Sequence, residues 1–122
     1  MTYKRFDVVV VPFPFTDRKA DKRRPALILS DKMQFNKPSG HAVLAMITSQ
    51  NNPDWPLDTK ITGNRKSGLK APSKVRMKLF TLDNRLIVRQ IGTLIDTDKK
   101  AVAKALQRLL ATRMDAAKSK NG

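Results

Sequence analysis

Short apolar segments recur between residues 7 and 94, and each is too short to form a buried helix. They are rich in valine, isoleucine, leucine and phenylalanine, and proline, glycine, asparagine or charged residues separate them. These segments are residues 7–15 (DVVVVPFPF), 25–30 (PALILS), 42–48 (AVLAMIT), 57–61 (LDTKI), 74–79 (KVRMKL) and 86–94 (LIVRQIGTL). The pattern predicts five or six short β-strands.

Three of these segments carry more detail. Residues 42–48 are nearly all apolar, which indicates a strand buried on both faces at the centre of the sheet. Residues 57–61 alternate apolar and polar side chains, as in a half-buried edge strand. In the first segment, Pro12 and Pro14 cannot donate ladder hydrogen bonds, so we expect a bend or an edge there. Phe13 and Phe15 share a parity, and we expect both to face the core.

The periodicity changes after residue 95. Val102, Leu106, Leu109 and Leu110 follow helical spacing, so a C-terminal amphipathic helix is predicted with these residues in the core. Asp96 or Thr97 is expected to cap its start, and the tail from residue 116 to fray. The fold class predicted is therefore mainly β: a small, strongly curved β-barrel with a C-terminal α-helix, in a single domain spanning residues 1–122.

The charge balance indicates the class of partner. The 122 residues include 25 Lys and Arg against 10 Asp and Glu, a formal net charge of +15. An excess of this size favours a polyanion, with nucleic acid as the first candidate. The chain has no cysteine and one histidine, which excludes thiolate metal sites and argues against a histidine-built one. We expect no metal and no cofactor.

Hydropathy gives an expectation about location. The longest apolar stretch, residues 6–15, falls well short of the ~20 residues that a membrane span needs, and no signal peptide precedes it. We therefore expect a soluble, cytoplasmic protein without a membrane partner.

Two loops carry candidate contacts to a polyanion. Residues 16–23 (TDRKADKR) predict an exposed, mobile loop that can face phosphates. The residues proposed to form a phosphate track along this loop and the later basic stretch are Lys19, Lys22, Arg23, Lys74 and Arg76. Trp55, between Pro53 and Pro56, can stack on a splayed RNA base. It can equally pack beneath its loop or at a dimer contact.

Three strings in order carry a family resemblance. Residues 7–30 contain VVPFPFTD and RRPALILS, residues 46–50 read MITSQ, and residues 69–87 contain LKAPSKVR and KLFTLDNRLI. This series resembles the MazF/PemK family of toxin endoribonucleases over roughly residues 5 to 112. The resemblance implies an SH3-like barrel and a homodimer with single-stranded RNA across its groove. It also implies cleavage at short RNA sequences and inhibition by an antitoxin, which the charge suggests is acidic.

The resemblance also implies roles for particular residues. Arg24, before the proline of the RP motif, and Thr48, in the ITS motif, match the family's catalytic pair. Ser73 matches a serine beside the substrate groove, although a turn residue is an equally good interpretation. Arg76 matches a basic residue that some members use at the site. The chain departs from many members in having no glycine in its first loop and no acidic residue shortly after Arg76.

Cleavage without a metal requires attack of the ribose 2′-hydroxyl on phosphorus, leaving a 2′,3′-cyclic phosphate and a 5′-hydroxyl. The guanidinium fork of Arg24 suits stabilisation of the phosphoryl charge, and Thr48 can donate a hydrogen bond. Neither is a good general base, since arginine has a pKa above ~12. His41 is the obvious substitute, but along one strand it lies about 23 Å from Thr48 on the opposite face, so only a dimer could bring it to the site.

Two other functions fit the same residues. A non-catalytic nucleic-acid-binding module would use the same barrel and charge, with Arg24 as one more phosphate contact. A relative of the toxins that acts mainly through a protein partner is the third interpretation.

Overall fold

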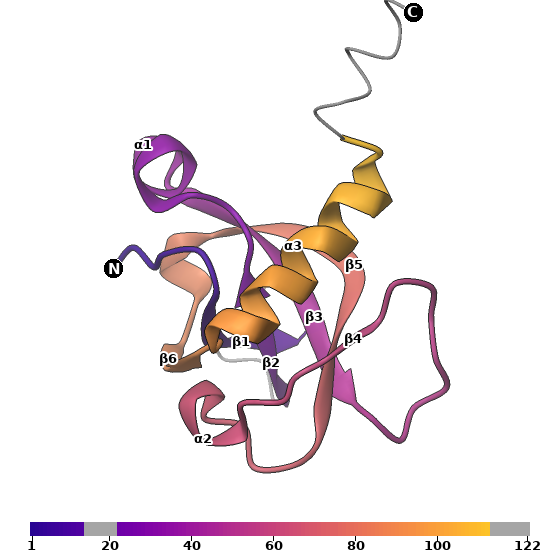
Figure 1. Ribbon diagram of the computed structural model, residues 1–122. Helices are drawn as coiled ribbons and strands as arrows, with labels where there is room; N and C mark the ends of the chain where they lie inside the picture. Colours follow the sequence, from indigo (N-terminus) through magenta and orange to yellow (C-terminus); the bar gives the residue numbers. More distant parts are fainter. Residues whose placement is uncertain (14–21, 113–122) are drawn as a thin grey trace, which may run out of the picture.

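The structure, a computed structural model, describes residues 1–13 and 22–112. Its strands form one curled antiparallel sheet in the order β4-β5-β3-β2-β1-β6 (Figure 1). The strands are β1 Asp7–Phe13, β2 Lys22–Ile28, β3 His41–Ser49, β4 Thr59–Lys60, β5 Ser73–Asp83 and β6 Arg89–Thr93. The prediction of a mainly β, strongly curved sheet with a C-terminal helix is confirmed.

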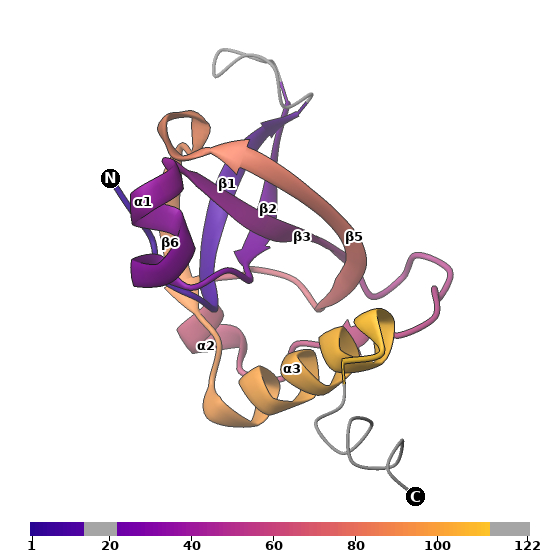
Figure 2. The ribbon, with the colours of Figure 1, turned by 90° about the horizontal axis from the view of Figure 1, so that it is seen from above.

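Helices occupy the connections and the C-terminal end. A π-helical turn, Lys32–Asn36, runs into α1, Lys37–Ser39, and a second short helix is α2, Asn64–Ser67. The long helix α3, Asp96–Leu110, packs against one side of the sheet (Figure 2). None of the helices in the described part of the chain is long and apolar enough to cross a membrane.

The strand order agrees with the patterns of individual segments. β3 lies between β5 and β2, as its nearly unbroken apolar sequence predicts, and the short β4 is an edge strand. β6 pairs with β1 only as far as Val10, so Pro12 lies where the ladder on that side has ended. Pro14 and Phe15 lie outside the described residues.

The two faces of the sheet bury separate cores. Val8 of β1 packs in one cluster with Val102 of α3, whereas the next residue of β1, Val9, belongs to a second cluster on the other face. The second cluster consists of Tyr3, Val9, Val11, Ala26, Ile28, Ala42, Leu44, Leu82 and Ile87. Burial on both faces explains why the sequences of β1 and β3 do not alternate.

Two expectations for the C-terminal helix are wrong. Neither Asp96 nor Thr97 caps it, because Ile95 occupies the N-cap position and no side chain bonds there. Leu109 and Leu110 are 40% and 54% exposed. The buried contacts of α3 end near Leu106, so its last turn has no core beneath it.

Asp98 joins α3 to the loop after β4, and its loss should destabilise the fold. This buried carboxylate accepts hydrogen bonds from the backbone N–H groups of Thr62 (2.9 Å) and Gly63 (3.0 Å) and from the Thr62 hydroxyl (2.7 Å). We expect Asp98→Ala to lower the free energy of unfolding by about 3 kcal/mol, because two backbone donors lose their acceptor. Urea unfolding measures this loss.

The exposed Asp96 in the same helical turn is the matched control, and Asp96→Ala should change the free energy of unfolding by less than about 1 kcal/mol. Equal losses in the two variants would contradict the role given to Asp98.

Candidate active site

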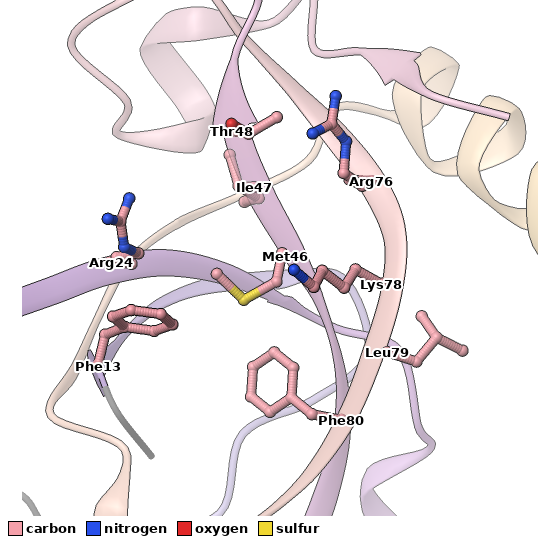
Figure 3. Close-up of a pocket in the computed structure, with 9 residues that line it drawn as sticks. All are labelled: Phe13, Arg24, Met46, Ile47, Thr48, Arg76, Lys78, Leu79 and Phe80. Carbon is pink, nitrogen blue, oxygen red and sulfur yellow. The ribbon is translucent and has the colours of Figure 1, made fainter. Parts of the chain in front are cut away.

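A hollow of about 270 Å³ opens where the second core ends. Residues two apart on a strand point to the same face of the sheet. The face that buries the second core therefore continues from Val11 to Phe13 on β1 and from Ala26 to Arg24 on β2. On β3 it continues to Met46 and Thr48. The lining residues are Phe13, Arg24, Met46, Ile47, Thr48, Arg76, Lys78, Leu79 and Phe80 (Figure 3). The structure thus brings together Arg24, Thr48 and Arg76, three of the site residues predicted from sequence.

An irregularity in β5 shapes one wall of the hollow. Ala45 pairs with Leu79, but the next residue of β3, Met46, pairs with Arg76. Two extra residues of β5 therefore bulge out of the ladder, which bends a strand locally and re-aims its side chains. Arg76 and Lys78 both reach the hollow from this segment (Figure 3).

Arg24 lies in a strand and not at the end of a loop. β2 begins at Lys22, three residues earlier than the sequence pattern predicts, because residues 22–24 pair with the end of β1. The Arg24 guanidinium lies 4.9 Å from the centroid of the Phe13 ring, a cation–π distance. Phe13 is 38% exposed, so the expectation that it faces the core is wrong. Its ring lies instead against the Arg24 guanidinium.

Thr48 has a defined hydrogen-bond partner. The Asn52 side-chain amide donates to the Thr48 hydroxyl oxygen at 2.5 Å. A hydroxyl has one proton to donate and two acceptor positions, so this bond leaves the Thr48 proton available. Asn52 thereby orients the hydroxyl group.

Arg76 is held by the loop between β3 and β4. Its guanidinium donates to both Asp58 carboxylate oxygens (3.2 and 2.9 Å) and to the Pro53 carbonyl (2.7 Å). Burial raises the pKa of Asp58, but hydrogen bonds from Arg76 and from the Trp55 backbone outweigh it and leave this pKa lowered. The pKa of Arg76 is raised by its hydrogen bonds to Asp58.

Lys74 is not the surface cation expected from sequence. It is 2% exposed, and its ammonium donates to the Asn52 carbonyl (2.6 Å) and to Asp54 (2.8 Å) and lies 3.4 Å from Asp58. Residues 52–58 fold over the lysine, which explains its burial. We call Lys74, Arg76, Asp54 and Asp58 the loop clamp.

Trp55 and Ser73 lie near the hollow without lining it. The Trp55 ring is 44% exposed, with the Arg76 guanidinium 4.9 Å and the Lys78 ammonium 5.7 Å from its centroid. Ser73 is buried, and its hydroxyl donates to the Ala71 carbonyl at 2.8 Å. Ser73 thus has a turn-forming contact, the structural interpretation that the sequence left open.

The remaining residues singled out from sequence lie elsewhere. Lys22 and Arg23 are exposed at the start of β2, and Lys19 lies outside the described residues. His41 begins β3 and Thr48 lies near its other end, so the separation expected along one strand is confirmed. The Nδ1 atom of His41 lies 2.9 Å from the Ser39 carbonyl oxygen.

The loop clamp makes the stability of the folded protein depend on pH. Hydrogen bonding and charge attraction from Lys74 lower the pKa of Asp54, and the pKa of Asp58 is lowered as well. An aspartate whose pKa is lower in the folded than in the unfolded protein stabilises the fold at every pH above its unfolded-state pKa. This contribution is lost as the pH falls through the folded-state pKa. We expect thermal stability to fall below about pH 4. In Asp58→Asn this acid-dependent loss should be smaller, and an unchanged pH profile would contradict the clamp.

Residues 4–110 match the model of the PemK-like, MazF-like toxins of type II toxin-antitoxin systems. The chain belongs to this family. No curated protein sequence matches the chain.

Solved structures share the fold of this MazF/PemK family member. A MazE-MazF structure from Deinococcus radiodurans superposes with a TM-score of 0.71 at 19% identity, covering 93% of this chain and 99% of that one. The Mycobacterium tuberculosis toxin MazF-mt6 gives 0.68 at 23% identity, covering 88% and 98%. An endoribonuclease in complex with its cognate antitoxin, from a mycobacterial species, gives 0.70 at 15% identity, covering 92% and 96%.

Several contacts of the site were missed from sequence. Alternation placed Asp58 on the solvent side of an edge strand, whereas its side chain is 7% exposed and pairs with Arg76. Neither Asn52 nor Lys78 was singled out from sequence as a site residue. The cluster of polar residues just after the ITS motif was the available signal, but it does not indicate which side chains turn inward.

Proposed function

We propose that this protein is an endoribonuclease toxin that cleaves single-stranded RNA at the hollow between β1, β2, β3 and β5. The observation that supports this most is the lining itself. Arg24 and Thr48, from two separate strands, share one hollow with Arg76 and Lys78, and no carboxylate lines it among the described residues. Such a site favours a phosphodiester over a neutral or cationic ligand.

Arg24 and Thr48 have distinct roles in this proposal. The Arg24 guanidinium binds two phosphoryl oxygens and stabilises the charge that develops as the 2′-oxygen bonds to phosphorus. The Phe13 ring, 4.9 Å from the guanidinium, helps to position it through a cation–π contact. The Thr48 hydroxyl, oriented by Asn52, donates a hydrogen bond to a phosphoryl oxygen.

The reaction proceeds by transfer within the RNA strand. The 2′-oxygen forms a bond to phosphorus and loses its proton, the bond from phosphorus to the 5′-oxygen breaks, and that oxygen gains a proton. In-line positioning and charge stabilisation lower the barrier without an ideal general base. Among the described residues, no group of three His, Asp or Glu side chains that could hold a metal ion is found.

Partners and location follow from the same proposal. The +15 net charge suits both RNA and an acidic antitoxin, and one similar structure is an endoribonuclease with its cognate antitoxin. We propose that the protein acts in the cytoplasm as a homodimer and that an antitoxin neutralises it. Co-expression with a neighbouring acidic reading frame should relieve any growth arrest.

Incubation of the purified protein with a long single-stranded RNA in EDTA tests the proposal. Discrete fragments support sequence-specific, metal-independent cleavage. Intact RNA that the folded protein nevertheless binds in a salt-dependent manner would instead establish the non-catalytic binding module.

A further inference from the structure

A second hollow, of about 340 Å³, lies on the other side of β2. Arg23 and Arg24 are neighbours in this strand and point to opposite faces of the sheet. Arg23 lines only the second hollow of the two, whereas Arg24 lines both. The two hollows therefore meet at Arg24.

The walls of the second hollow are joined backbone to backbone. The residue after α2, Gly68, has a φ of +76°, and a Cβ there would lie 2.0 Å from the Ile91 carbonyl oxygen. A Cβ on Gly92 of β6 would lie 2.3 Å from the Ser67 carbonyl carbon. Only glycine permits both approaches. This contact fixes the α2 turn, and with it the chain leading to Lys70, against β6.

The lining is cationic over an apolar floor. Arg23, Arg24, Lys70 and Arg89 line the second hollow together with apolar groups that include Val10 and Ile91. No carboxylate lines it within residues 1–13 and 22–112, and no described acidic side chain forms an ion pair with Lys70 or Arg89. Uncompensated cations around a concave surface concentrate positive potential there.

We propose that the second hollow is an RNA subsite that binds the nucleotide adjacent to the phosphate held at Arg24. The inference rests on the proposed function, because it takes the phosphate at Arg24 to be the scissile one. RNA carries a phosphate at every nucleotide, so a strand bound at Arg24 brings the next phosphate close to Lys70 and Arg89. RNA would contact both parts of this hollow, with its phosphate on the cations and its base or ribose on the apolar floor. Carboxylate side chains of an acidic protein would contact only the cations.

Binding of uncleavable RNA tests the subsite separately from cleavage. The probes are 2′-O-methyl oligonucleotides of about four and about twelve nucleotides, titrated at several salt concentrations into the full chain. For Lys70→Gln/Arg89→Gln, we expect affinity for the longer probe to fall about tenfold. The salt slope should decrease by about 1.4, since each contact on a single strand contributes about 0.7.

The control variant, Lys100→Gln/Lys104→Gln, removes the same charge from exposed positions of α3 and should keep the wild-type salt slope. Unchanged affinity and slope in the Lys70/Arg89 variant, with its circular dichroism and melting temperature preserved, would overturn the subsite. The subsite would also be overturned if the Lys70/Arg89 variant lost binding to polyglutamate but bound RNA like the wild type. That result would assign the hollow to an acidic protein.

The proposed function and the subsite can fail separately. If the wild type binds both probes but never cleaves RNA, the endonuclease activity fails while the Lys70/Arg89 comparison still decides the subsite. If RNA is cleaved normally and the double variant binds like the wild type, the subsite alone fails.

Discussion

Arg24→Ala should lower the rate of RNA cleavage by about a thousandfold while leaving the fold intact. The side chain is exposed, so its removal creates no cavity in either core. Its guanidinium is the cation of β2 that lines the proposed active site, where loss of one donor to a developing negative charge costs about 10²–10³ in rate. Single-turnover cleavage of a labelled RNA measures the effect.

Two further variants make the Arg24 result specific. Arg24→Lys keeps the charge but loses the fork that binds two oxygens, so it should recover only part of the rate. Arg108→Ala removes an exposed arginine from α3 and should cleave at nearly the wild-type rate. If Arg24→Ala cleaved as fast as Arg108→Ala, Arg24 would have no role in the reaction.

Lys74→Met should lower the free energy of unfolding by about 3 kcal/mol and also slow cleavage. The buried ammonium is the centre of the loop clamp, and methionine of similar length supplies none of its hydrogen bonds. The bond from Lys74 to the Asn52 carbonyl is one of the contacts that position the Asn52 amide beside Thr48, and the variant loses it. Urea unfolding and single-turnover cleavage measure the two effects.

Lys60→Met is the matched control, because Lys60 is exposed and lies opposite Lys74 in the ladder between β4 and β5. It should unfold and cleave like the wild type. A Lys74 variant as stable and active as the Lys60 variant would show that the clamp contributes nothing.

Strands could be located from sequence where burial requires apolar residues along the whole strand. The apolar sequence of β3 indicates a strand buried on both faces, and the β-branched run of β1 indicates a strand; both lie inside the sheet. The amphipathic spacing of α3 was likewise sufficient to find the helix. Its last turn was not predictable, because the pattern of Leu109 and Leu110 does not show where the sheet beneath them ends.

The candidate site was only partly predictable from sequence. The motifs indicated Arg24 and Thr48, which line one hollow, but nothing local distinguished Lys74 from the exposed lysines around it. Its burial depends on Asp54 and Asp58, about twenty residues away along the chain, and the bulge that aims Arg76 depends on the register against β3. Contacts of this kind arise from tertiary packing and leave no periodic signal.

The most direct test of the central claim uses one modified nucleotide. Once a cleavage site is mapped, an RNA with a single 2′-deoxy nucleotide on its 5′ side lacks only the attacking hydroxyl. We expect this RNA to bind normally but not to be cleaved there, and the unmodified RNA to yield 2′,3′-cyclic phosphate and 5′-hydroxyl ends. Cleavage of the 2′-deoxy RNA at the normal rate, or products with 5′-phosphate ends, would contradict the central claim.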